Sequence, residues 1–176
     1  MEYRDAFYGL SGHRRFVCHQ QVVELPAHVR PTSGFLDATA LVNFLVARIF
    51  NGFVEIFTPG GKHVGHLERG AWLNSPWGVV WTPRDFGTFS NTILVGNFGS
   101  GWIAAFNGFT YKFIGFVKNP DDSILTIDGL WALAFGNNGA AGPSTTLYFS
   151  AGPDGETHGL FGTLTPVAAE NNGSIE

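Results

Sequence analysis

The stretch NSPWGVV at residues 74–80 decides the fold, because a similar pattern recurs as DGLWALA at residues 128–134. The two copies align without a gap, and the alignment continues unbroken from ILVGN at 93–97 to LYFSA at 147–151. Each block is a short apolar run, and Gly, Asn and Pro lie between the blocks. A repeat of about fifty residues with this punctuation is typical of the blades of a β-propeller.

A third block extends the alignment after a slip of one residue, with WIAAF at 102–106 placed over THGLF at 157–161. The aligned aromatic and glycine positions predict which residues fill the core of each repeat. This predicted repeat core consists of Trp77, Gly78, Phe106, Trp131 and Phe161.

The apolar runs and the turn residues between them predict short antiparallel strands throughout residues 51–166. A hairpin at 53–57 and 62–67 forms the outer half of one blade. The strands of the next blade are predicted at 78–82, 92–96, 101–106 and 111–117, and those of a further blade at 130–135, 147–150 and 160–164. The predicted fold is all-β: a partial β-propeller of two to three four-stranded antiparallel blades, an incomplete ring where closed propellers have about four to eight blades.

Two segments flank this region. Residues 1–50 match the repeat poorly and are either a diverged blade or an unrelated leader, although FVCHQQVVEL at 16–25 predicts a strand. The apolar run at 38–50 is too short to span a bilayer, so no transmembrane segment is predicted. The acidic and aromatic start of the chain does not resemble a signal peptide. Residues 167–176 form a polar tail.

Composition narrows the function classes. Of 176 residues, 44% are hydrophobic, 15% are aromatic and only 14% are charged, which favours a folded β-rich domain over disorder. The net charge of -4 supplies no basic field, so we expect no nucleic-acid partner. The single cysteine excludes an intrachain disulfide framework.

An incomplete ring exposes apolar faces and strand edges at both ends of the array. We therefore expect either that residues 1–50 cap the array, or that the chain self-associates through its open blade edges. A truncated gene product is an equally good interpretation of a repeat that stops within a blade.

Longer strings carry a family resemblance. LNSPWGVVWTPRDFGTFSNTILVGNFGSGWIAAFN at 73–107 and IDGLWALAFGNNGAAGPSTTLYFSAGPDGETHGLFGTLTP at 127–166 resemble the C-terminal part of an uncharacterised bacterial β-propeller family. The blade core at 76–80 and 93–97 is also similar to NHL-type repeats. The resemblance implies a propeller of about six blades in an exported or cell-surface protein, some members ending in a PEP-CTERM sorting signal. It brings no established activity.

The connections between strands hold the candidate site residues. In an up-and-down blade, the connection into the first strand and the turn between the second and third strands emerge on the same face. Six polar residues lie in those connections and are predicted to project toward the mouth of the central channel: Asn74, Asn97, Asp128, Asp154, Glu156 and His158.

Two interpretations of these six residues remain open. Their oxygens suit calcium, and the arrangement resembles lactonase-type propellers in which a metal polarises an ester carbonyl. The competing interpretation, to which we give more weight, is that Asn and Asp bond their own backbone in turns while Glu156 and His158 lie on the surface. The tryptophans Trp77, Trp81, Trp102 and Trp131 are predicted to pack between blades.

Two functions follow. We favour a non-catalytic binding or scaffold module, because no nucleophile elbow or phosphate loop occurs in the sequence. The alternative is a calcium-dependent lactonase-type hydrolase that uses Asn74, Asn97 and Asp128 as ligands.

Overall fold

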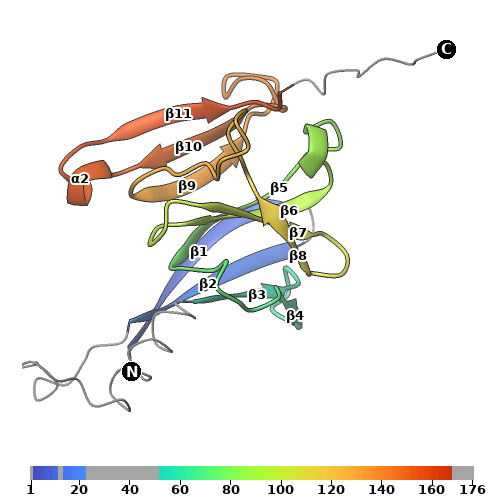
Figure 1. The fold of residues 1–176 in the computed structure, drawn as a ribbon. Coiled ribbons are helices and arrows are strands. Elements are labelled where there is room, and N and C mark those ends of the chain that lie inside the picture. The colour runs from blue at the N-terminus through green and yellow to red at the C-terminus, as the bar shows by residue number, and fades with distance from the viewer. Residues whose placement is uncertain (1, 12–13, 23–51, 168–176) are drawn as a thin grey trace, which may run out of the picture.

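The computed structural model describes residues 52–167 in full and residues 2–11 and 14–22 as backbone. In these ranges the strands form three antiparallel sheets, which lie one above another in Figure 1. The described residues are mostly β-strand, as predicted. The same ranges contain no helix with the length and apolarity needed to cross a membrane.

The first sheet joins the start of the chain to the predicted hairpin. Its strands run in the order β1 (Glu2–Ser11), β2 (Arg14–Val22), β3 (Phe53–Phe57) and β4 (His63–His66). The alternation of β3 places Val54 and Ile56 in the core, both fully buried. The hairpin is confirmed, and the strand expected at 16–25 is found as β2. The apolar run at 38–50 lies outside the described residues.

The second sheet reproduces the predicted blade strand by strand. It contains β5 (Pro76–Trp81), β6 (Thr92–Asn97), β7 (Ile103–Asn107) and β8 (Phe113–Phe116) in that order, with a short 3-10 turn, η2 (Gly87–Phe89), between β5 and β6. Every residue of β6 is buried. A strand that is apolar on both faces belongs between two other layers, which is where the first and third sheets place it.

The third sheet has three strands, as the sequence predicted. They are β9 (Leu130–Phe135), β10 (Leu147–Ala151) and β11 (Leu160–Leu164), with the one-turn α2 (Pro153–Glu156) between β10 and β11. β10 is the central strand and pairs with both neighbours. Its burial alternates, so Leu147, Phe149 and Ala151 face the second sheet while Tyr148 and Ser150 face away.

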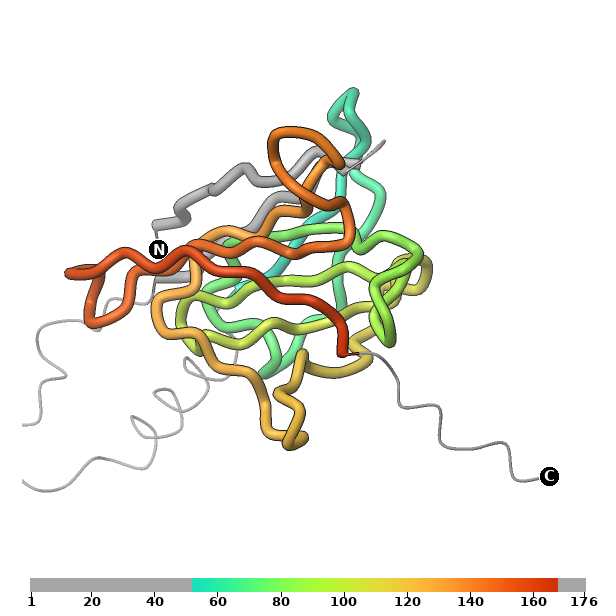
Figure 2. The backbone as a smooth tube through the Cα atoms, turned by 90° about the horizontal axis from the view of Figure 1, so that it is seen from above, coloured from blue at the N-terminus to red at the C-terminus, as the bar shows by residue number. Residues whose placement is uncertain are grey.

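Two hydrophobic cores hold the three sheets together. The first core joins Val54 and Ile56 of β3 to Ile93, Val95 and other residues of the second sheet. The second core joins the opposite face of the second sheet, including Leu94 and Ala105, to the inner face of the third. Figure 2, the view down the stack, shows the third sheet lying over the second.

The first strands of the sheets are the contact points of the stack. β1 contacts β5, and β5 contacts β9. Gly78 of β5 lies so close to β9 that a Cβ atom added there would be 2.8 Å from the backbone nitrogen of Leu133 and 2.9 Å from the carbonyl oxygen of Trp131. Only glycine allows two backbones to approach this closely. Gly78 therefore lies at the contact between the second and third sheets.

The pairing of β11 differs from the sequence alignment. β6 pairs Gly96 with Ile103, whereas β10 pairs Ser150 with Phe161. Gly96 and Ser150 are equivalent in the ungapped part of the alignment, so Phe161 occupies the position of Ile103. The turn that contains α2 is longer than the turn between β6 and β7, and the extra residues shift the register.

This shift changes the environment of one predicted core residue. Phe106 is fully buried, as predicted. Phe161, which the alignment placed at the same position, is 72% exposed on the outer face of the third sheet. Phe161 therefore does not take the buried position that Phe106 has in the second sheet.

Candidate functional site

Asn97 and Asn74 form one closely bonded pair. Asn97 is fully buried at the end of β6, and its Oδ1 accepts a hydrogen bond of 2.7 Å from the backbone nitrogen of Asn74. Its Nδ2 donates to the carbonyl oxygens of Trp72 and Trp102, both at 3.2 Å. Both ends of the amide are thus occupied by backbone groups. These hydrogen bonds join the residues that lead into β5 to the turn that follows β6.

Asp128, Asp154 and His158 form a second, exposed group at the corresponding connections of the third sheet. Asp128 Oδ2 accepts a hydrogen bond of 3.0 Å from the backbone nitrogen of Asp154. His158 Nδ1 lies 3.4 Å from Asp154 Oδ2 and 3.0 Å from the hydroxyl of Thr157. The backbone nitrogen of Glu156 donates to Gly152, and the Glu156 side chain is exposed. Asp128 also links two connections, but here the side chain lies before the first strand of the sheet and accepts from the backbone that follows the second strand.

The two groups occupy the same end of the stack, because Trp77 and Trp131 meet between them. Their rings contact edge to face with centroids 4.4 Å apart, and Phe98 lies 4.8 Å from Trp131. Trp77 of the second sheet and Trp131 of the third thus pack against each other between the two sheets.

The other two predicted tryptophans make different contacts. Trp81 packs against the core between the first and second sheets. The ring of Trp102 contacts Phe116 of its own sheet, with centroids 5.2 Å apart.

The polar residues do not gather into one ligand set. Among residues 52–167, no three His, Cys, Asp or Glu side chains are placed to hold a metal ion. The side chain of Asn97 is fully buried, and its Oδ1 already accepts the Asn74 bond. Asp128 contacts the backbone of Asp154, and Asp154 contacts His158.

A groove at the rim of the second and third sheets was not predicted from the sequence. It has a volume of about 600 Å³. Its apolar walls come from η2, from the connection that follows β8 and from the end of β11, and include Phe86, Phe89, Val117, Leu125, Leu147 and Leu164. Its polar rim includes Thr88, Lys118, Asn119, Asp122 and Thr165.

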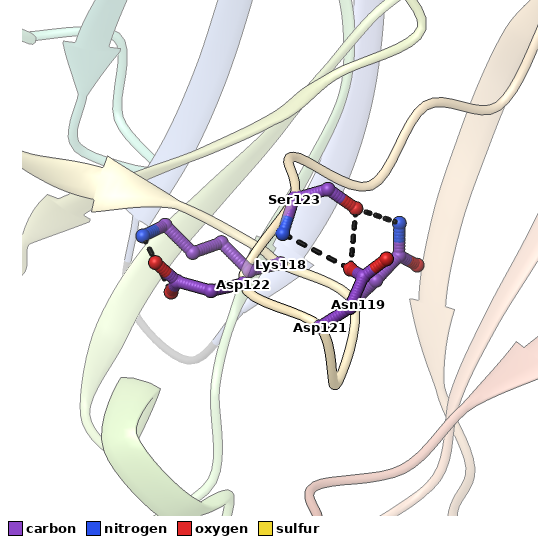
Figure 3. Close-up of polar contacts among 5 residues, drawn as sticks. All are labelled: Lys118, Asn119, Asp121, Asp122 and Ser123. Carbon is purple, nitrogen blue, oxygen red and sulfur yellow. Dashed lines mark hydrogen bonds and ion pairs between the residues drawn. The ribbon is translucent and has the colours of Figure 1, made fainter.

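The turn at 118–123 contributes to the polar rim of the groove and is held by the polar contacts drawn in Figure 3. Asp121 Oδ1 accepts hydrogen bonds from the hydroxyl of Ser123 at 2.5 Å and from its backbone nitrogen at 3.0 Å. These two bonds, the hydroxyl first, lower the pKa of Asp121 below its ordinary value. Asn119 Nδ2 donates to the same hydroxyl at 3.0 Å, and Lys118 pairs with Asp122 at 2.7 Å.

The groove could not be read from the repeat, because its walls come from segments that are far apart in the chain. The sequence does carry one local signal, which is KNPDDS at 118–123. Asn, Pro, Asp and Ser in succession predict a tight turn with side chains bonded to its own backbone. Nothing in that pattern indicates which other segments lie beside the turn.

The chain is similar to uncharacterised proteins of Acanthamoeba polyphaga mimivirus. It is 34% identical to protein L690 over 119 residues, which are 64% of this chain and 29% of that protein. It is 37% identical to protein R640 over 79 residues, which are 45% of this chain and 15% of that protein. The chain is 31% identical to a third such protein, R648, over 119 residues, which are 64% of this chain and 27% of that protein.

These comparisons correct the resemblance drawn from the sequence. The matched relatives are viral, so the assignment to a bacterial propeller family is wrong. The chain spans less than a third of the length of the curated relatives that it matches. No family model matches the chain, and no solved structure matches it.

Proposed function

We propose that this chain is a section of a β-propeller and serves as a non-catalytic binding or scaffold module. Three successive antiparallel sheets, in contact through their first strands β1, β5 and β9, support the propeller arrangement. In both sheets a bond between a side chain and the backbone joins the residues before the first strand to those after the second strand, which also supports it. The acceptor is Asn97 in the second sheet and Asp128 in the third. The proposal includes the similarity of the segments at 76–80 and 93–97 to NHL-type repeats.

The observation that carries the non-catalytic role is the use made of the candidate polar side chains. Asn97 and Asp128 both accept hydrogen bonds from backbone nitrogens and hold two connections together. A catalytic group must instead reach a substrate atom within hydrogen-bond distance. This use favours a stabilising role over the calcium-dependent lactonase alternative, which needs Asn74, Asn97 and Asp128 to share one ion.

The rim groove is the binding surface of the module under this proposal. Apolar walls and a rim of amide, hydroxyl and charged groups are the usual lining of a ligand site. The turn at 118–123 is held by its own hydrogen bonds, so the rim is formed before any ligand arrives. Preformed rims lose little entropy on binding.

Calcium titration followed by thermal melting tests the non-catalytic role. We expect the chain to have the same melting temperature in millimolar calcium chloride as in sodium chloride of equal ionic strength. An ion that does not bind the native state cannot stabilise it. Asp128→Asn is the matched variant, since it keeps an oxygen for the Asp154 backbone bond and removes the charge.

A calcium-specific rise in melting temperature that Asp128→Asn abolishes would contradict the proposal and favour the metal-dependent alternative. A rise that persists in Asp128→Asn would place a calcium site elsewhere in the chain. The variant should melt close to the unmodified chain without calcium, because the bond to Asp154 is retained.

A further inference from the structure

The outer edge of β11 is an open strand edge. β11 pairs with β10 through all five of its residues, Leu160 to Leu164. In the part of the chain that the structure describes, no backbone hydrogen bond is made to its opposite edge. An edge strand of this kind presents a row of unpaired N–H and C=O groups to any other strand.

The edge of β8, by contrast, is blocked. The carboxylate of Glu68 accepts a hydrogen bond of 2.9 Å from the backbone nitrogen of Phe113, the first residue of β8. Lys112 lies just before the strand and pairs with Glu68 at 3.2 Å, and Lys118 lies just after it. Charged groups at an edge are the usual protection against pairing with another chain.

β11 carries no such protection. From Gly159 to Val167 the sequence GLFGTLTPV contains no charged residue. Leu160 is 46% exposed and Phe161 is 72% exposed. The ring of Phe161 stacks on Tyr148 of β10 at 5.8 Å, which holds it on the outer face of the sheet. The third sheet thus ends in an uncharged edge with apolar side chains in solvent.

We propose that two copies of this chain associate by antiparallel pairing of their β11 edges, so that the two third sheets form one continuous six-stranded sheet. The absence of charge favours a second copy as the occupant. Pairing about a twofold axis brings each strand against itself, and like charges would then repel across the interface. In β11 there are none, and the exposed Phe161 of each copy lies on the same face of the joined sheet.

This inference is independent of the proposed function, because it depends only on the edge of β11. Sedimentation velocity of the full chain over a concentration series is the direct test. We expect a reversible monomer–dimer equilibrium that shifts toward dimer as concentration rises. A chain that stays monomeric at every concentration would overturn the proposal.

A charged substitution at the edge of β11 tests whether this edge forms the dimer interface. Phe161→Lys brings two ammonium groups together in the pair and should abolish the dimer. Phe109→Lys is the matched control, since Phe109 is 78% exposed in the turn between β7 and β8 and the charge change is the same. Dimerisation that survives Phe161→Lys, or that both variants lose alike, would refute pairing through β11.

Amide hydrogen exchange of the unmodified chain provides a reading that needs no variant. Pairing buries the outward amides of β11, so exchange in residues 160–164 should slow as concentration rises, while exchange in β8 stays constant. Exchange in β11 that is independent of concentration, in a sample that sedimentation shows to be dimeric, would mean that the copies meet elsewhere.

Discussion

Asn97 is a candidate metal ligand by its residue type and position in the sequence, but in the fold its side chain forms hydrogen bonds with backbone groups. Its position at the end of β6 and its amide oxygen are what a channel-mouth ligand requires. Burial decides the matter, because a buried amide must satisfy its donors and its acceptor. Only backbone groups of Trp72, Asn74, Val95 and Trp102 are within reach, and Asn97 bonds to all four.

Replacement of this side chain should be costly. We expect Asn97→Ala to lower the free energy of unfolding by about 1 to 3 kcal/mol, because it removes the acceptor of the Asn74 nitrogen and a donor to the Trp72 carbonyl at a part-buried place. Denaturant unfolding measures the change. Asn137→Ala is the control, since the same side chain there bonds to turn nitrogens in solvent and its loss should cost at most about 1 kcal/mol. Equal effects would mean that burial of Asn97 is unimportant.

The carboxylate of Glu68 joins the first sheet to the second and should titrate below its ordinary pKa of 4.5. The main cause is the hydrogen bond from the backbone nitrogen of Phe113, and Lys112 lowers the pKa further. A lowered pKa means that the native state favours the charged form. The stabilisation is therefore present above pH 4.5 and is lost as pH falls through the lowered pKa.

Carbon-13 NMR titration of the Glu68 carboxyl checks this assignment. The midpoint should lie below 4.5, and it should stay below 4.5 in Lys112→Gln because the backbone bond is the larger cause. A midpoint that returns to 4.5 in Lys112→Gln would show that the ion pair, and not the Phe113 bond, lowers the pKa.

Strands were predictable where each has its own apolar pattern and its own turns. β5 to β10 follow the predicted ranges because Val79, Ile93, Val95 and Phe106 must reach a core, and because Gly, Asn and Pro end the strands between them. β11 was predicted at the right residues but in the wrong register. Register depends on the length of the preceding turn, and an alignment by residue type cannot measure that length.

The contact between β5 and β9 depends on the absence of a side chain at Gly78. We expect Gly78→Ala to destabilise the chain by about 2 to 3 kcal/mol or more, because its Cβ would meet the β9 backbone, which cannot move aside as a side chain can. Gly159→Ala is the control, since a Cβ there meets nothing within 4 Å. Thermal or denaturant unfolding should show the difference. Similar stability of the two variants would contradict the contact.

At the scale of the whole molecule, the sequence predicted layered antiparallel sheets but could not place the first and last segments. β1 and β2 lack the repeat's landmark residues, so only their pairing with β3 shows that they belong to the first sheet. The rim groove and the open edge of β11 also arise from packing. The groove depends on how neighbouring sheets pack, and the open edge depends on which strands pair with β11, and no local pattern encodes either.

The glycine contact between β5 and β9 also bears on the distant groove. The second and third sheets touch at their first strands and part at their last, where the groove opens. Gly78 lies at the contact between β5 and β9. We therefore expect a larger side chain at Gly78 to alter the spacing of the two sheets that line the groove, although Gly78 itself does not line it.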